Sequence, residues 1–384
     1  MAQAPKVVVI GAGIVGVSVA YFLARAGIRA VLIDSSSPSA GATGSSDGAI
    51  SVASKQPGML MAFAQQARGL YARLSDEGVL AGLYQRRPTY LIARSTEEMA
   101  LLELHASDLR SAGEAIEVAD RAGLVGQIPD LGECVHGGVI VQNDGHALGY
   151  QITERLLRLA ELDVLRNCAC QRLIQVENKV TGIVTSQGEI AADFVVVAAG
   201  LESGRLCGFT KAIFPRKGQI IITDSARPGE VAFNGQVMAA TYIAAKRRGA
   251  KAPPSPIGLV IDPLLTGQFL IGGTREDNRV DTGTDVGAIS AILREAIELY
   301  PPLMTRRVIR TFSGVRSASH DGIPIVGFHP EVDNLLIATG FEGDGICLGP
   351  LTGSIVADLL LGRDHEVDIA AFDPTRLAPS GVAA

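Results

Sequence analysis

Residues 6–34 read KVVVIGAGIVGVSVAYFLARAGIRAVLID, and they carry the clearest pattern of secondary structure in the chain. Lys6–Ile10 is mainly a run of β-branched residues, which predicts a strand buried on both faces of a parallel sheet. A glycine-rich turn and an apolar helix to about Ala26 follow, and Gly27 is a typical helix C-cap. Ile28–Asp34 then predicts a second strand. The stretch is therefore a complete βαβ unit.

The turn of this unit carries a dinucleotide-binding pattern. Gly11 permits a tight turn, Gly13 lets the backbone approach a pyrophosphate, and Gly16 allows the helix to pack closely on the strand. The N–H groups at the start of the helix favour phosphate. Asp34 ends the second strand 18 residues after Gly16, where a carboxylate can bind ribose hydroxyls. A glycine-rich turn between core elements is the alternative, but it leaves the second strand and its terminal acid unexplained.

A second loop of small residues, Ser39–Ile50 (SAGATGSSDGAI), follows Asp34. Its hydroxyls, notably those of Thr43, Ser45 and Ser46, can add contacts to a pyrophosphate or a flavin. A nicotinamide-binding domain would normally continue into regular βα units at this point. Composition by itself leaves the choice between nicotinamide and flavin open.

Composition and charge exclude several classes of protein. The chain has 384 residues, enough for two or three domains, and its 44 glycines follow no repeat. A net charge of -6 argues against nucleic acid or an anionic membrane as the main partner. The five cysteines are typical of free thiols in a reducing compartment, so we expect a cytoplasmic protein. Neither they nor the six histidines form a metal-binding pattern.

The apolar stretch Val7–Ala24 is long enough to imitate a signal sequence or a membrane span. Three glycines interrupt it, and Arg25 follows at once. We therefore expect no transmembrane segment.

Later segments return to the same sheet. Asp193–Gly200 and Asn334–Thr339 predict buried strands, and a helix from about Ile346 to Leu361 follows the second of them. Two other regions differ from these βα segments: a helix-rich stretch over Thr96–Ala122, and antiparallel strands between residues 219 and 272. Lys246–Pro256 (KRRGAKAPPSP) predicts an exposed loop.

These segments predict an α/β fold with a Rossmann-like nucleotide-binding domain and an inserted, mixed α+β substrate domain. We assign residues 1–85, 140–212 and 306–384 to the first domain and residues 86–139 and 213–305 to the second.

At this point the chain resembles the D-amino-acid oxidase/glycine oxidase superfamily of FAD-dependent oxidoreductases over nearly its whole length. The blocks that carry the resemblance, in order, are Gly11–Gly16 with Asp34, Gly41–Ile50, Ala191–Gly200, PRKGQ at 215–219, GGTRE at 272–276, SGVRSASHDGIPIVG at 313–327 and TGFEGDGICLGPLTG at 339–353. Asp34 stands where the family often has Glu, and either carboxylate can hold ribose hydroxyls. The resemblance implies FAD, bound noncovalently because no cysteine lies in the Ser319-His320 region.

Ser54–Gly58 (SKQPG) is similar to one branch of this superfamily. The branch contains β-subunits of multi-subunit dehydrogenases that act on opines, on D-hydroxyproline, or on glycine in hydrogen cyanide synthase. It implies an amine or amino-acid dehydrogenase with a larger FAD and iron–sulfur partner subunit, in some members with FMN at the subunit interface. Such a partner could attach the chain peripherally to a membrane. The alternatives are a self-contained, oxygen-using amino-acid oxidase and a non-catalytic flavin-bearing assembly component.

The resemblance also implies roles for individual residues. Arg316 matches the family's carboxylate-binding arginine, although a structural arginine at a domain junction is the alternative. Tyr242, on a candidate strand of the substrate domain, would cover the pocket or pack in the core. The helix that starts near Ile346 would stabilise negative charge on the flavin. Glycine oxidases carry an arginine close to Gly343; its absence here argues against glycine as the substrate.

Glu342 and Asp344 are candidate acids or bases, but hydride transfer from a neutral amine requires neither, so a turn or a flavin contact is the preferred interpretation. The expected catalytic residues are Arg316 and Tyr242. The expected cofactor-binding residues are Gly11, Gly13, Ile14, Val15, Gly16, Asp34, Ser35, Gly41, Ala42, Thr43, Ser45, Ser46, Gly48, Ala49, Ile50, Val176, Ala199, Gly200, Gly314, Arg316, Gly340, Glu342, Gly343, Asp344, Gly345 and Ile346.

Overall fold

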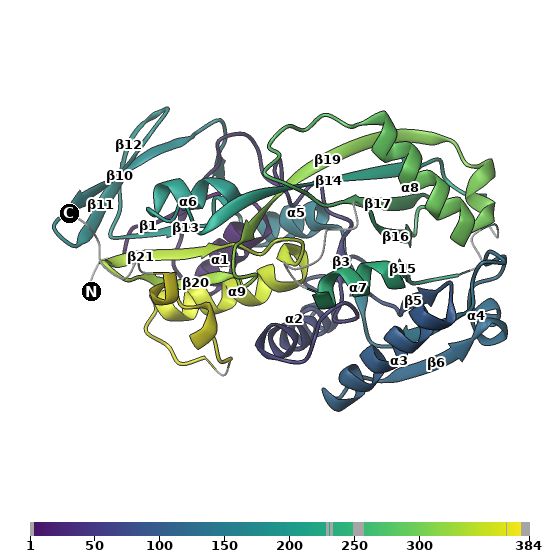
Figure 1. Ribbon diagram of the computed structural model, residues 1–384. Coiled ribbons are helices and arrows are strands. Elements are labelled where there is room, and N and C mark those ends of the chain that lie inside the picture. Colours follow the sequence, from purple (N-terminus) through teal and green to yellow (C-terminus); the bar gives the residue numbers. More distant parts are fainter. Residues whose placement is uncertain (1–3, 228–229, 231–232, 249–256, 366, 378–384) are drawn as a thin grey trace.

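The computed structural model describes residues 4–227, 230, 233–248, 257–365 and 367–377, which form two large sheets (Figure 1). The first sheet has six strands in the order β20-β21-β13-β1-β2-β9, parallel except for the pair β20–β21. Their bounds are β1 Val7–Ile10, β2 Val31–Ile33, β9 Val164–Leu165, β13 Phe194–Val197, β20 Ile325–His329 and β21 Val332–Thr339. The expected Rossmann-like sheet is confirmed.

Both faces of this sheet are covered, as the apolar sequence of β1 predicts. Val7 and Val9 face a core shared with helices, whereas Val8 and Ile10 face a second core beneath a small antiparallel sheet. The helices are α1 (Ile14–Arg25), α2 (Met59–Asp76), α5 (Gly149–Leu159) and α9 (Gly345–Leu360), and the small sheet consists of β10 (Cys170–Val176), β11 (Lys179–Thr185) and β12 (Gly188–Ala191).

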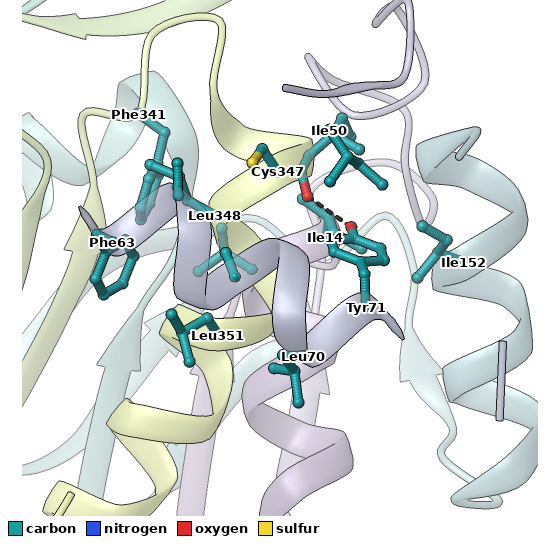
Figure 2. Packing of buried hydrophobic residues seen from close by; sticks show 14 of the residues in the cluster. Ile14, Ile50, Phe63, Leu70, Tyr71, Ile152, Phe341, Cys347, Leu348 and Leu351 are labelled. Atoms are coloured by element: carbon teal, nitrogen blue, oxygen red, sulfur yellow. Dashed lines mark hydrogen bonds between the residues drawn. The ribbon is translucent and has the colours of Figure 1, made fainter. Parts of the chain in front are cut away.

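Helices α1 and α9 approach closely because both have small residues at their contact. A Cβ on Gly353 would collide with Ser18, and one on Gly349 would lie 3.0 Å from Ile14 Cγ2. Helix α2 packs against α9, and the Tyr71 hydroxyl donates a 2.6 Å hydrogen bond to the carbonyl oxygen of Ile346 in the first turn of α9 (Figure 2). This packing holds the first turns of α1 and α9 near each other.

The second sheet has the order β18-β14-β17-β16-β15-β5-β7-β6, and β19 pairs with β14 on its other side. Its strands are β5 Thr89–Ala93, β6 Ile116–Asp120, β7 Gly137–Val141, β14 Ile213–Thr223, β15 Gln236–Ala239, β16 Ile257–Pro263, β17 Phe269–Thr274, β18 Glu276–Asp277 and β19 Val308–Ser319. The helices of this region are α3 Thr96–Ser111, α4 Arg121–Gln127, α7 Ala240–Arg248 and α8 Val286–Leu299.

Short elements complete the described chain. A three-stranded sheet joins β3 (Ala49–Ile50), β8 (Gly145–His146) and β4 (Gln85–Arg86). The remaining short helices are α6 (Ser203–Leu206) and 3-10 turns at Gly200–Glu202, Pro301–Thr305, Ala370–Phe372 and Pro374–Leu377.

The helix-rich stretch Thr96–Ala122 contains α3 and the start of α4, and β6 lies between them and pairs with β7. Two local predictions were wrong. Tyr242 lies on helix α7 rather than on a strand. Residues 246–248 end that helix instead of belonging to a loop, while 249–256 lie outside the described residues.

The two-domain division stays a prediction, but one of its boundaries disagrees with the strand pairing. Residues 306–319, assigned to the nucleotide-binding domain, include β19, which pairs with β14 from Ile213↔Ser319 to Thr223↔Val308. Residues 306–384 were assigned to one domain as a continuous segment, and the sequence does not indicate that its first strand pairs with the second sheet.

Candidate active site

A cavity of about 770 Å³ extends from the carboxyl ends of β1, β2 and β13 to the second sheet, where β14, β16, β17 and β19 line it. Open α/β sheets bind ligands at this edge. The predicted residues in its wall are Gly11, Gly13, Ile14, Val15, Asp34, Ser35, Gly41, Ala42, Thr43, Ser45, Ser46, Ala199, Gly200, Tyr242, Gly314, Arg316, Glu342, Gly343, Gly345 and Ile346.

The glycines after β1 shape the first part of the cavity. Gly11 has φ +105°, and a Cβ there would collide with the carbonyl oxygen of Ala198. Gly16 does not line the cavity; a Cβ there would collide with the carbonyl oxygen of Gly11, so its place is in the helix–strand contact. Around Gly13 only Thr43 Oγ1 would come near a Cβ, at 3.1 Å, so the backbone is open to a ligand.

Asp34 and Thr43 present oxygen atoms beside these glycines. The two carboxylate oxygens of Asp34 accept 2.8 Å hydrogen bonds from the N–H groups of Ala12 and Ser36, which fix the side chain at the end of β2. Each oxygen keeps a further lone pair for a ribose hydroxyl. Thr43 Oγ1 accepts a 3.0 Å hydrogen bond from the N–H of Ile14, which leaves its own hydroxyl hydrogen for a phosphate oxygen.

Several predicted cofactor residues are absent from the cavity wall. They are Gly16, Gly48, Ala49, Ile50, Val176, Gly340 and Asp344. Val176 is the clearest error: it ends β10 with 58% of its surface exposed. The beginning of this segment lines the cavity instead, through Cys168, Ala169 and Cys170.

Helix α9 presents its first turn to the cavity. Gly345 and Ile346 line the wall, but Asp344, the N-cap residue, makes no side-chain hydrogen bond to the helix. Its carboxylate lies 2.7 Å from the ammonium of the buried Lys55. The start of α9 therefore offers N–H groups and the positive end of a helix dipole to a ligand.

At the other end of the cavity, Arg316 on β19 lies against the backbone of Gly218 on β14. A Cβ on Gly218 would lie 2.5 Å from Arg316 Nη2, so the glycine makes room for the guanidinium group. Arg316 Nη1 donates a 3.3 Å hydrogen bond to the carbonyl oxygen of Thr274. Within the described residues no carboxylate forms an ion pair with Arg316, and the group can bind an anion in the cavity.

Tyr242 covers this end of the cavity from α7. Its ring occupies the space beside Gly258 on β16, where a Cβ would lie 2.5 Å from Cδ2. Lys246 Nζ and Arg275 Cζ lie 5.1 and 5.9 Å from the ring centre. The phenol ring therefore lies between Gly258 on β16 and the cationic groups of Lys246 and Arg275.

Glu342 is a partly buried carboxylate among these cations, with 18% of its side chain exposed. Its Oε1 lies 3.1 Å from Arg275 Nη2 and 3.3 Å from Arg216 Nη1, and its φ of +50° places it in the left-handed region. Burial raises the pKa of Glu342, but Arg275, Arg316 and Lys246 outweigh this and hold it well below the usual value. Glu342 is therefore an ionised anchor for the arginines rather than an acid–base group.

Sequence reasoning missed four charged residues at or beside the cavity: Arg216, Lys246, Arg275 and Asp47. Arg216 and Arg275 stand inside the quoted PRKGQ and GGTRE blocks, which could have drawn attention to them. Asp47 lines the cavity in the loop at 39–50, and burial together with Asp262 raises the pKa of its carboxyl. Among the described residues, no group of three or more side chains is suited to a metal ion.

This cavity fits FAD along its length. The Gly11–Gly13 turn leaves space where side chains would stand, Asp34 presents oxygens for a ribose, and two helix N-termini face the interior. The Arg316 end then has room for a small anionic substrate. No helix in the described part of the chain has the length and apolarity to cross a membrane.

The comparisons with known proteins agree with this assignment. A family model described as FAD dependent oxidoreductase matches residues 6–359. Glycine oxidase of Geobacillus kaustophilus is 26% identical over 383 residues, covering 96% of each chain, and that of Pseudomonas aeruginosa is 28% identical, covering 96% of this chain and 98% of the relative. The crystal structure of glycine oxidase from Geobacillus kaustophilus superposes with a TM-score of 0.86 at 24% identity, covering 98% and 99% of the two chains. The chain therefore belongs to the DAO family of FAD-dependent oxidoreductases.

Proposed function

We propose that this FAD-dependent amine and amino-acid oxidoreductase binds the carboxylate of its substrate at Arg316 and oxidises the adjacent C–N bond. The observation that carries the proposal is the guanidinium of Arg316, which faces the cavity against Gly218 without an ion-pair partner among the described residues. A planar, permanently charged group of this kind binds a carboxylate through two hydrogen bonds.

The residues of the chain position the substrate and the charge. When bound, FAD supplies the acceptor for the hydride that leaves the substrate carbon. Arg316 orients the carboxylate, Tyr242 covers this end of the cavity, and the start of α9, close to Arg316, would stabilise negative charge on the flavin. We propose noncovalent attachment of FAD, so acid denaturation should release all of it from the polypeptide.

For the electron acceptor we propose oxygen, with the chain acting as a self-contained oxidase. The named curated relatives are glycine oxidases, matched over nearly the full length of both chains. This reverses the preference drawn from Ser54–Gly58 for a dehydrogenase with an iron–sulfur partner. That partner, an interface FMN and peripheral membrane attachment remain predictions without support from the comparisons.

The charges around Arg316 favour a particular class of amine. Arg275 and Arg316 both line this end and Lys246 lies beside Tyr242, whereas the nearby carboxylates are those of Glu342 and of Asp47, whose pKa burial raises. Arg216 is paired with Asp277, with contacts of 2.5 and 3.0 Å, as well as with Glu342. The surplus of positive charge favours an amine with a second carboxylate, as in opines, over glycine.

Anaerobic reduction of the bound flavin by a panel of amines tests this proposal. The panel contains glycine, sarcosine, proline, D-hydroxyproline and opines, and bleaching of the flavin absorbance is the readout. We expect opines to reduce the flavin fastest, and in air we expect one peroxide per amine from the lone chain. Failure of every amine to reduce bound FAD would contradict the proposed oxidation, and reduction without peroxide would restore the dehydrogenase alternative.

A further inference from the structure

Lys55 connects two segments of the cofactor cavity through a buried ion pair. Its Nζ lies 2.7 Å from Asp344 Oδ1 and 2.8 Å from the carbonyl oxygen of Ser51. The side chains of Lys55 and Asp344 are 4% and 19% exposed. Ser51 directly follows the loop at 39–50, and Asp344 directly precedes α9, so one ammonium group joins both segments.

The ion pair turns Asp344 away from the helix that it begins. Aspartate at an N-cap usually accepts a hydrogen bond from the N–H groups of the first turn, but Asp344 accepts none. Gly343, Gly345 and Ile346 line the cavity, whereas Asp344 does not. The N–H groups at the start of α9 therefore remain available to a ligand. Ile14 and Ile50 lie beside this first turn, which includes Cys347 (Figure 2).

We propose that Lys55 is a positioning residue that withholds the Asp344 carboxylate from the start of α9 and thereby raises the reduction potential of the bound flavin. This role of Lys55 depends on the cofactor and not on which amine is oxidised. When FAD is bound, the start of α9 would stabilise the negative charge that the flavin gains on reduction.

The direction of the effect follows from charge. Burial raises the pKa of Asp344, but Lys55 and Lys246 outweigh it and hold this pKa below the usual value, so the carboxylate is ionised and compensated. Without Lys55, the carboxylate is free to cap α9 and to repel negative charge that develops in the cavity on reduction. In a buried environment such repulsion is only weakly screened.

Potentiometric titration of the holoprotein near neutral pH tests the proposal with Lys55→Met, Asp344→Asn and the double variant. We expect Lys55→Met to lower the equilibrium constant for two-electron reduction about tenfold, which corresponds to about 30 mV. Asp344→Asn leaves Lys55 uncompensated and should raise the potential. The double variant removes both charges and should return close to the wild-type value. Lys211→Met, on an exposed residue, is the matched control and should change nothing.

Equal potentials for Lys55→Met and the double variant would overturn the proposal, because the effect would then not pass through Asp344. An unchanged potential in Lys55→Met would overturn it too. If Lys55→Met does not retain FAD, the Asp344→Asn variant provides the test. A flavin reduction potential in Asp344→Asn at or below that of the wild type would contradict the proposal. A purely structural ion pair would alter stability without this opposite pattern of potentials.

Discussion

The guanidinium group of Arg316 rests on the backbone of Gly218, across the antiparallel pair β14–β19. A Cβ atom on Gly218 would lie 2.5 Å from Nη2 and 2.8 Å from Cζ. The position of the candidate carboxylate-binding group therefore depends on the absence of a side chain on the neighbouring strand.

Replacing Gly218 by alanine should displace Arg316 without removing it. Because the added methyl group occupies the place of the guanidinium, we expect KM for the amine to rise by about tenfold or more, while FAD content is unchanged. Steady-state kinetics and the flavin-to-protein absorbance ratio measure both effects. Gly69→Ala on the exposed side of α2, where a Cβ meets nothing within 4 Å, is the control. Loss of FAD in Gly218→Ala alone would assign this contact to cofactor binding.

Removing Arg316 should affect the substrate more than the cofactor. Each hydrogen bond between charged groups contributes about 1.5–3 kcal/mol, so Arg316→Ala should lower kcat/KM by about 100-fold or more. Lys at this position retains the charge without the planar fork, and Arg316→Lys should recover part of the loss. Rapid-reaction measurements of flavin reduction by substrate provide the test. An apoprotein from Arg316→Ala would instead identify a structural arginine.

Glu342 should stabilise the fold at neutral pH through Arg216 and Arg275. Breaking a fully buried ion pair costs about 3–5 kcal/mol, but the side chains of Glu342, Arg216 and Arg275 are 18%, 18% and 21% exposed. Solvent screens such pairs in part, so Glu342→Gln should lower the free energy of unfolding by about 1–3 kcal/mol. The folded-state pKa of Glu342 is lowered, so its contribution is complete above the usual value of 4.5 and disappears as pH falls through the folded-state pKa. The difference between wild type and variant should thus be constant from about pH 6 to 8.

Urea unfolding at several pH values measures this contribution. Glu331→Gln, on an exposed carboxylate, is the matched control and should have little effect at any pH. A Glu342→Gln difference that grows steadily between pH 6 and 8 would show that another group, not Glu342, supplies the ion-pair energy.

Gly11 should be essential for FAD binding, and comparison with Gly27 separates the effect of backbone strain from that of a steric collision. Gly11 and Gly27 both have positive φ, at +105° and +86°, so alanine is strained at either position. Only at Gly11 does a Cβ also collide with the chain, at the carbonyl of Ala198, whereas nothing lies within 4 Å at Gly27. Gly11→Ala should abolish FAD binding, and Gly27→Ala should cost about 1 kcal/mol of stability with FAD retained. Equal losses of FAD in both variants would attribute the effect to backbone strain.

Local patterns predicted the first half of the cavity well. The strand, turn, helix and second strand of residues 6–34 form in the expected order, because their hydrophobic period and glycine positions act over a few residues. The hydroxyl-rich loop at 39–50 lies beside this turn, as short connections require. The prediction that Val176 contacts the cofactor was wrong, because the two-residue period of a strand does not indicate which of its ends approaches a ligand.

The βαβ unit, the glycine turn and the acid at Asp34 could be predicted from the amino-acid sequence, since each depends on backbone geometry set by near neighbours. The charged end of the cavity could not be predicted in this way, because it forms only when distant segments pack together. Lys55 and Asp344 are 289 residues apart, and Arg216 and Glu342 are 126 apart, so their pairing depends on how α9, β14 and β19 pack. Contacts of this kind follow from the packing of whole elements, which no periodicity in a short stretch encodes.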